Sequence, residues 1–387
     1  MSCLNPATGA NTSVWYIQEV DCNVTPDNPA WKPWSMTGGI PQLTREALTS
    51  ATLSGNREMS AFRLSNKQAS GETNVEITFG AQDDFIEAAS QSTWVVGAVD
   101  SDVELTFAAA DKSLTRADGD FTTNINVGDF IKVSTATLGG NNKPLYVTAV
   151  EATKLTFGLC KDGQIVDETI TADVKVNDTL VVGNTRRTFS ILVHYQDLDD
   201  GNGGYDLITG VEITGQSYEI GVNAYVTGTF PMIGRGYKTN VNLPAGSTFL
   251  PKNENRPFTG LDGRVIQDGY TLGFVTSVTP SQDNTANAIF EIGNDGVAAI
   301  EYGRANNTFT ISTYFYDYAL MDKFVNEEET SAIFAVSLDG NLLAWDYQTF
   351  LYSSGAPSIE GEGSITVEMS AQSYAKGDKP SLIMRRI

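Results

Sequence analysis

The sequence has few of the residues on which catalysis and metal binding usually depend. Among 387 residues there is one histidine, His194, and there are three cysteines, Cys3, Cys22 and Cys160, at spacings that match no zinc or redox motif. A Ser-His-Asp triad would have to use His194. Ser190 shares a face with it on the strand expected there, but no G-x-S-x-G turn accompanies the pair. We therefore interpret His194 as an ordinary sheet residue and the cysteines as buried or idle thiols in a reducing compartment.

Positive charge and long apolar runs are also scarce. The chain has 25 Lys and Arg against 47 Asp and Glu, which gives a formal net charge of -22. Phosphate contacts need clustered Lys and Arg, so a protein that grips nucleic acid is excluded. No stretch approaches the roughly 18 apolar residues of a membrane span, and no basic segment followed by an apolar core begins the sequence. We expect a protein with no membrane partner, made in the cytoplasm.

Acidic residues are abundant, which leaves two kinds of acidic site to consider. A glycosidase needs two carboxylates that face each other across a cleft, and the neighbours Asp83 and Asp84 supply no such arrangement. We interpret those two residues and Asp317 as helix-capping residues. The segment 197–206 resembles a calcium loop but lacks Gly at its sixth position and Glu at its twelfth, so we interpret it as a hairpin tip. Its candidate ligands are Asp197, Asp199, Asp200, Asn202 and Asp206. The sequence therefore predicts no catalytic residue, no metal site and no cofactor, and a protein that is not an enzyme.

Short alternating runs and 36 glycines indicate a mainly β protein built from antiparallel strands. Typical strands are expected at 74–79, 188–195, 332–338 and 364–372. Two segments, 83–90 and 318–326, have apolar residues at helical spacing behind acidic residues instead. Each is long enough for one short helix.

The two expected helices lie at matching places in a repeated pattern. Residues before and within them correspond at an offset of 235. The matched pairs are Phe79 with Tyr314, Phe85 with Leu320, Ile86 with Met321 and Ala89 with Phe324. Self-similarity at a fixed period indicates a duplicated structural unit. We therefore predict a tandem duplication of a unit that has several strands and one short helix.

The duplication predicts a domain organisation. Residues 1–40 are an N-terminal arm, and the first copy is split into 41–97 and 181–232 by an insertion at 98–180. That insertion has successive short strand patterns separated by Gly and Asn turns, which is typical of a small β domain. A Pro-, Gly- and Asn-rich linker spans 233–262, and the second copy spans 263–387.

Long collinear stretches of the chain resemble a known family. They are SVWYIQEVDCNVTPDNPAWKPWSMTGG (13–39), LTREALTSATLSGNREMSAFRLSNKQASGETNVEITFGAQDDFIEAASQSTW (43–94), FVTSVTPSQDNTANAIFEIGNDGVAAIEYG (274–303), TYFYDYALMDKFVNEEETSAIFAV (313–336) and GEGSITVEMSAQSYA (361–375). Together they are similar to the tail tube (major tail) proteins of long, non-contractile-tailed bacteriophages. The resemblance covers most of the chain outside the insertion.

The resemblance implies a fold and a function. Each copy would be a pair of packed antiparallel sheets flanked by one short helix, and strands of neighbouring subunits would join around a hollow lumen. Since one-copy relatives form six-membered rings, a two-copy chain implies three chains per ring with pseudo-sixfold symmetry. Stacked rings then form a tube through which DNA passes without specific binding, because an acidic lumen repels phosphates.

The resemblance also implies partners and a location. The partners are the protein itself and the tape measure, terminator and distal tail proteins of a virion assembled in the bacterial cytoplasm. In relatives a loop before the second strand reaches the adjoining ring. Here that place holds three cations, Arg57, Arg63 and Lys67, which we expect to meet carboxylates of the next ring.

Other classes remain open from the sequence. They are another tail ring protein, such as a terminator or distal tail protein, a surface β adhesin, and a glycan-degrading β enzyme. The enzyme hypothesis needs aromatic side chains such as Trp94 and Trp345 to stack on sugars. In a tube protein the same residues would lie in a core or an interface.

Overall fold

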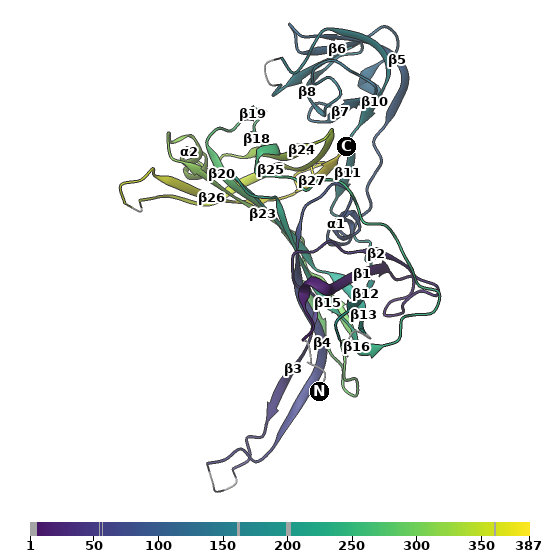
Figure 1. Ribbon diagram of the computed structural model, residues 1–387. Helices are drawn as coiled ribbons and strands as arrows, with labels where there is room; N and C mark the ends of the chain where they lie inside the picture. Colours follow the sequence, from purple (N-terminus) through teal and green to yellow (C-terminus); the bar gives the residue numbers. More distant parts are fainter. Residues whose placement is uncertain (1–5, 54, 56, 161–162, 199–202, 360) are drawn as a thin grey trace.

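The computed structural model describes residues 6–387 except 54, 56, 161–162, 199–202 and 360. The expected mainly β fold is confirmed: the described chain has strands throughout and two short helices, α1 (Asp83–Ala89) and α2 (Ala319–Val325). Figure 1 shows an elongated molecule with a small barrel at one end and a long two-stranded arm at the other. No helix in the described part is long and apolar enough to cross a membrane.

A closed six-stranded barrel follows α1, with the strand order β10-β5-β6-β9-β8-β7. Its strands are β5 (Val99–Ala108), β6 (Ser113–Arg116), β7 (Phe130–Val133), β8 (Leu145–Val150), β9 (Lys154–Gly158) and β10 (Glu168–Val176). Alternate residues such as Val103, Leu105 and Phe107 point inward and form a separate apolar core. The barrel falls within the segment 98–180, where the sequence places an inserted β domain.

The remaining strands form two units, which we call the first and the second unit. The first unit comprises β1 (Thr12–Gln18), β2 (Ala30–Pro33), β3 (Gln42–Thr49), β4 (Phe62–Glu76), α1, β11 (Asp178–Val181), β12 (Phe189–Tyr195), β13 (Gly204–Ile213), β14 (Gly215–Gly221), β15 (Thr227–Gly234) and β16 (Gly236–Val241). The second unit comprises β18 (Gly263–Gln267), β19 (Tyr270–Thr271), β20 (Val275–Asp283), β21 (Asn287–Ile289), β22 (Ala299–Glu301), β23 (Asn306–Tyr314), α2, β24 (Thr330–Leu338), β25 (Asn341–Ser358), β26 (Thr366–Ser373) and β27 (Ile383–Arg386). Between them β17 (Thr248–Phe249) pairs in parallel with β2.

The strands of the two units pair in the same order. β1 pairs with β12 and β12 with β13, as β18 pairs with β24 and β24 with β25. β14 pairs with β15 and β15 with β4, as β25 pairs with β26 and β26 with β23. β3 flanks β4 as β20 flanks β23, and β16 lies on β13 as β27 lies on β25. The long strand β25 of the second unit thus corresponds to β13 and β14 together.

One antiparallel sheet, which we call the shared sheet, runs through both units. Its strand order is β3-β4-β15-β14-β20-β23-β26-β25. The two units meet in it where β14 pairs with β20, with Ser217 opposite Ser281. Each unit therefore contributes four strands to a single continuous ladder.

The main core lies behind the shared sheet and is common to both units. Fully buried aromatic residues such as Phe230 of β15 and Phe309 of β23 belong to it. Tyr218 and Trp345, from different units, have ring centroids 4.6 Å apart. Each large apolar side chain buried here contributes roughly 1.5–3 kcal/mol relative to exposure, so the two units stabilise each other.

The constant offset of 235 residues fits neither the helices nor the strands. The helix α1 begins at Asp83 and α2 begins at Ala319, which is an offset of 236. Side chains alternate along a strand, and Ile77 faces the core, whereas residue 312, which is 235 positions later, faces outward. Hydrogen bonds give the offset as 238, because Ile77 N donates to Val226 O as Phe315 N donates to Ile365 O. The expected match of Phe79 with Tyr314 therefore fails, since the turn before the helix, 77–82 in the first unit and 315–318 in the second, is two residues shorter in the second unit.

Candidate functional site

The face of the shared sheet that points away from the core is polar. From Ser70 in β4 across the sheet to Gln372 in β26, none of the described side chains on this face is basic. Hydroxyl and amide residues follow one another across the strands. One row of cross-strand neighbours is Asn74, Thr229, Ser217, Ser281, Thr308 and Gln372. Thr229 donates to Asn74 Oδ1 across this row at 2.7 Å. A polar, solvated face opposite an apolar one is the usual state of an antiparallel sheet that covers one core.

Five carboxylates stand on this face. They are Glu72, Glu76, Glu219, Asp283 and Glu368, and they come from four strands of the shared sheet and both units. Within the described chain, no Lys or Arg forms an ion pair with any of them. The face therefore presents uncompensated negative charge over a wide area, which suits repulsion of a polyanion.

Both outer edges of the shared sheet are open. On one side, residues 36–44 flank β4, and Gly38 makes a bridge to Asn74. On the other side, residues 354–357 of β25 pair with β26 along one edge, and no strand of the described chain lies along the other. An unpaired edge is a template for another strand. The structure thus offers two complementary edges at the ends of one sheet.

The arm seen in Figure 1 consists of β3 and the first half of β4. Every residue of β3 is exposed, and apolar side chains such as Leu48, Phe62 and Leu64 are 56%, 58% and 49% exposed. A two-stranded hairpin by itself is only marginally stable in water. Exposed apolar residues on such a hairpin indicate a surface that another molecule covers.

The three cations predicted to mediate stacking all belong to this arm. The expected loop is only partly present, because β4 begins at Phe62 and includes Arg63 and Lys67. Lys67 forms an ion pair at 2.7 Å with Asp295 of its own chain, so its charge does not require a carboxylate of another ring. Arg57 and Arg63 have no acidic partner in the described chain. Arg45, which the sequence analysis missed, lies opposite Lys67 on β3.

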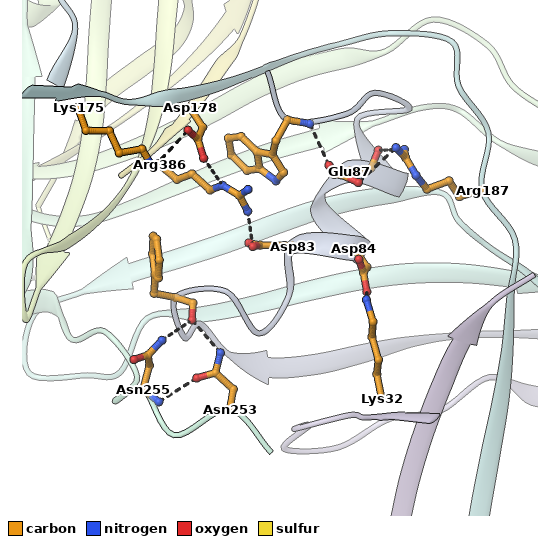
Figure 2. Close-up of polar contacts among 12 residues, drawn as sticks. Lys32, Asp83, Asp84, Glu87, Lys175, Asp178, Arg187, Asn253, Asn255 and Arg386 are labelled. Carbon is orange, nitrogen blue, oxygen red and sulfur yellow. Dashed lines mark hydrogen bonds and ion pairs between the residues drawn. The ribbon is translucent and has the colours of Figure 1, made fainter. Parts of the chain in front are cut away.

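The acidic residues of α1 are held by cations (Figure 2). Asp83 pairs with Arg386 of the C-terminal strand, and Asp84 pairs with Lys32. Glu87 pairs with Arg187 at 3.2 Å. Neither Asp83 nor Asp84 caps the helix, because Gln82 is the N-cap residue and makes no side-chain cap bond. The capping interpretation is thus wrong for these two, although their carboxylates lie in the first turn, where the helix dipole favours them.

Asp317 fits its expected role better. Its carboxylate accepts a hydrogen bond of 2.9 Å from Ala319 N, at the start of α2. Asp317 precedes the N-cap residue Tyr318, so the same acidic sequence pattern serves a turn hydrogen bond before α2 and ion pairing in α1.

The other residues with candidate chemistry have structural roles. His194 stacks on Tyr205 with ring centroids 4.3 Å apart, while Ser190 is buried and donates to Glu19. In 197–206, Asp197 accepts hydrogen bonds from Thr8 and Asn11, and Asp206 accepts one from Tyr237. Asp199, Asp200 and Asn202 lie outside the described residues. No cluster of three or more possible metal ligands occurs among the described residues.

Two further expectations concern aromatic and thiol groups. Trp94 and Trp345 are 6% and 1% exposed, so both are core residues, and neither can stack on a sugar as the enzyme hypothesis requires of them. Cys22 and Cys160 are free thiols, and burial raises the pKa of Cys160. Cys3 lies outside the described part of the chain.

These features define a mainly β structural protein whose sheet has open edges and a polar face. The family model described as phage tail tube protein matches residues 9–373, and the chain belongs to this family. It is therefore a structural protein of the phage tail and a component of the virion, and the family implies association with itself and with other tail proteins. No curated protein matches the chain.

Proposed function

We propose that three copies of this chain close a ring that forms one layer of a hollow tail tube. The two units are two copies of one tube domain, so a ring has three true and six approximate repeats. The observation that carries this proposal is the contact between β14 and β20, which joins two similar four-stranded halves inside one chain. The identical pairing order of the two units supports the same conclusion.

The contact inside the chain predicts the contact between chains. In the second unit, residues 354–359 correspond to 215–220 of β14, and in the first unit, residues 39–44 correspond to 278–283 of β20. Ser217 lies opposite Ser281, so Ala356 should lie opposite Gln42 of the next chain. Antiparallel pairing at each of three such contacts leaves no open sheet edge around the ring.

The mass of a single ring tests the stoichiometry. Three chains of 41.7 kDa give a ring of about 125 kDa, whereas a ring of six chains would have twice that mass. We expect mass photometry of unstacked rings to give the smaller value. A six-chain ring would refute the proposed role of the duplication.

In this arrangement the polar face of the shared sheet lines the lumen. The apolar side of the sheet is covered by the core. The polar side carries five carboxylates per chain and, across the described strands from β4 to β26, no Lys or Arg. DNA phosphates in transit meet like charge and hydroxyl groups, so DNA passes without sticking. The protein has no catalytic role in this function.

The arm makes the contact between rings. Rings stack by a heterologous contact that does not close, which produces a tube. Arg57 and Arg63 lie on an exposed hairpin with apolar neighbours and meet acidic side chains of the adjoining ring, on a chain with a net charge of -22. Lys67 instead holds the base of the arm to Asp295.

Charge reversal on the arm should separate stacking from ring closure. We expect Arg63→Glu to leave rings of normal mass but to shorten or abolish tubes, because like charges then face each other between rings. The control is Lys143→Glu, the same charge change at an exposed residue of the barrel. Tube lengths from negative-stain images decide the result, and full-length tubes of the Arg63→Glu variant would contradict the role of the arm.

The proposal extends to the setting of the tube. The tail is the long, non-contractile kind, assembled in the bacterial cytoplasm with tape measure, terminator and distal tail proteins as partners. A terminator or a distal ring would stop at one ring, whereas a tube protein continues to add rings. Polymerisation beyond a single ring therefore distinguishes these roles.

A further inference from the structure

Two short segments of the chain share a sequence and a conformation. Residues 6–11 (PATGAN) and 257–262 (PFTGLD) have Pro, Thr and Gly at the same positions. Each ends in a single 3-10 turn, Gly9–Asn11 or Gly260–Asp262, after an extended threonine. Each turn leads directly into the first strand of its unit, β1 or β18. The two segments are therefore equivalent parts of the two units.

Residues 257–260 lie in a slot of the first unit, between the end of β4 and the start of β15. Phe258 N donates to Ile77 O at 2.9 Å, and Val226 N donates to Phe258 O at 2.9 Å. Thr259 makes an antiparallel bridge to Tyr225. Phe258 is 1% exposed, so its side chain is fully inserted, and the segment acts as a short added strand.

The glycine of this segment is required by the slot. A Cβ on Gly260 would lie 2.0 Å from the carbonyl oxygen of Gly221. The neighbouring Leu261, in contrast, is 82% exposed and points into solvent. The slot thus requires a residue without a side chain at Gly260, whereas it does not restrict the side chain at Leu261.

The second unit has the same slot, and no described residue of the chain fills it. Phe315 N donates to Ile365 O at 2.9 Å, as Ile77 N donates to Val226 O in the first unit. Phe315 O and Ile365 N, the groups that correspond to those bound by Phe258, have no hydrogen-bond partner among the described residues. The rim is apolar and open, with Tyr314 45% and Tyr316 66% exposed.

We propose that residues 6–11 of one chain fill this slot in the second unit of the neighbouring chain. This inference rests on the ring proposed above, in which the second unit of one chain meets the first unit of the next. Ala7 takes the place of Phe258, donating its N–H to Phe315 O and accepting from Ile365 N. Three such insertions per ring tie each chain to the next at a place separate from the sheet edges.

The properties of the segment suit this occupant. Residues 6–11 are exposed in the single chain, and a Cβ on Gly9 would meet nothing within 4 Å. No contact inside the described chain thus requires glycine there, but the slot does. The larger Phe315 stands where the first unit has Ile77, and the smaller Ala7 stands where the linker has Phe258. Since both pairs contain a phenylalanine, the net change is one isoleucine replaced by one alanine, so the slot of the second unit is filled by three fewer side-chain carbons.

Cross-linking in assembled rings tests the contact directly. Thr8 corresponds to Thr259, and Ser364 corresponds to Tyr225, so Thr8 and Ser364 of adjacent chains should be antiparallel partners with Cβ atoms about 4.5–5.5 Å apart. We expect the T8C/S364C variant, treated with a short bis-maleimide, to give covalent two- and three-chain species. The A10C/S364C variant should give none, because Ala10 corresponds to the solvent-facing Leu261. The single cysteine variants are controls, because they show any cross-link that an introduced cysteine makes with the native Cys3, Cys22 or Cys160.

A pair of size changes tests the fit without cross-linking. Gly9→Val should raise the protein concentration needed for rings by about tenfold, the factor that corresponds to 1.4 kcal/mol, while the thermal unfolding of the single chain is unchanged. Ala10→Leu should alter neither quantity. This inference would be overturned if wild-type rings have normal mass, the T8C/S364C variant gives no cross-link and the Gly9→Val variant assembles normally. The proposed ring would then remain intact. Absence of rings from the wild type would refute both.

Discussion

Replacing Arg385 with methionine is expected to lower the free energy of unfolding by about 3–5 kcal/mol. The side chain of Arg385 is 7% exposed and binds Asp129 of the barrel at 2.6 Å and Asp346 of β25 at 2.9 Å. Without it, two buried carboxylates lose their cation, and the barrel loses a tie to the second unit. Guanidinium denaturation followed by tryptophan fluorescence measures the change.

An exposed ion pair supplies the matched control. Arg256 binds Asp339 at 2.5 Å, and both side chains are more than half exposed. Arg256→Met should leave the denaturation midpoint nearly unchanged, because water and salt screen such a pair. Equal shifts of the denaturation midpoint for the two variants would show that burial of Arg385 with Asp129 and Asp346 contributes nothing to stability.

The pH dependence of the Arg385→Met defect provides a second check. Burial raises the pKa of Asp346, and loss of the cation raises it further. An acid whose pKa is higher in the folded state contributes stability below its unfolded pKa and loses that stability as pH rises through its folded pKa. The loss of unfolding free energy caused by Arg385→Met should therefore be largest at neutral pH and become smaller toward about pH 4, near the unfolded pKa of an aspartate. A defect that does not change over this range would point to lost packing alone.

Charge reversal on the polar face should make tubes retain DNA. The lumenal variant carries Glu76, Glu219 and Glu368 replaced by Lys, three outward positions on three strands of the shared sheet. We expect wild-type tubes to protect no linear duplex DNA from nuclease and the lumenal variant to protect it. Protection should fall steeply with salt, because binding releases counterions from the phosphates.

A matched exterior variant separates lumen from surface. Glu104, Asp118 and Glu151 are exposed on the barrel, and their replacement by Lys changes the charge by the same amount. DNA bound there should stay sensitive to nuclease. Protected DNA in the exterior variant, or none in the lumenal variant, would mean that the polar face of the shared sheet does not line the channel.

Much of the architecture follows from local pattern, and the errors have local causes. The helices 83–90 and 318–326 were predictable because apolar residues such as Phe85 and Ile86 recur at helical spacing behind acidic residues. The constant offset failed because the turn between strand and helix differs in length between the two units, so that no single offset fits both elements. The polar face was not predictable, because Glu72, Glu219 and Glu368 come together only through strand pairing across both units.

The ion pairs of α1 were also beyond the sequence. Nothing near Asp83 indicates that its partner, Arg386, lies 303 positions away on the last strand. The segment shared by 6–11 and 257–262 was visible in the sequence, but its meaning depends on the slot that Phe258 fills. Local sequence therefore specifies elements, while pairing across units specifies surfaces.

The two units differ most in the loop before their second central strand. In the first unit this loop extends as the arm of β3 and β4. In the second unit β21 and β22 fold back, and Val297 and Ile300 pack on Ile233 of β15. A ring of three chains therefore carries three arms although it has six similar domains. In the proposed ring, duplication would let the arm of one copy make the contact between rings while the other copy has none.

Electron microscopy of concentrated protein with symmetry analysis tests the central claim most directly. We predict hollow tubes of stacked rings with threefold symmetry, in which six similar lobes surround the lumen and three arms per ring reach the next layer. Rings with sixfold symmetry and six chains, or discrete particles at every concentration, would contradict the account.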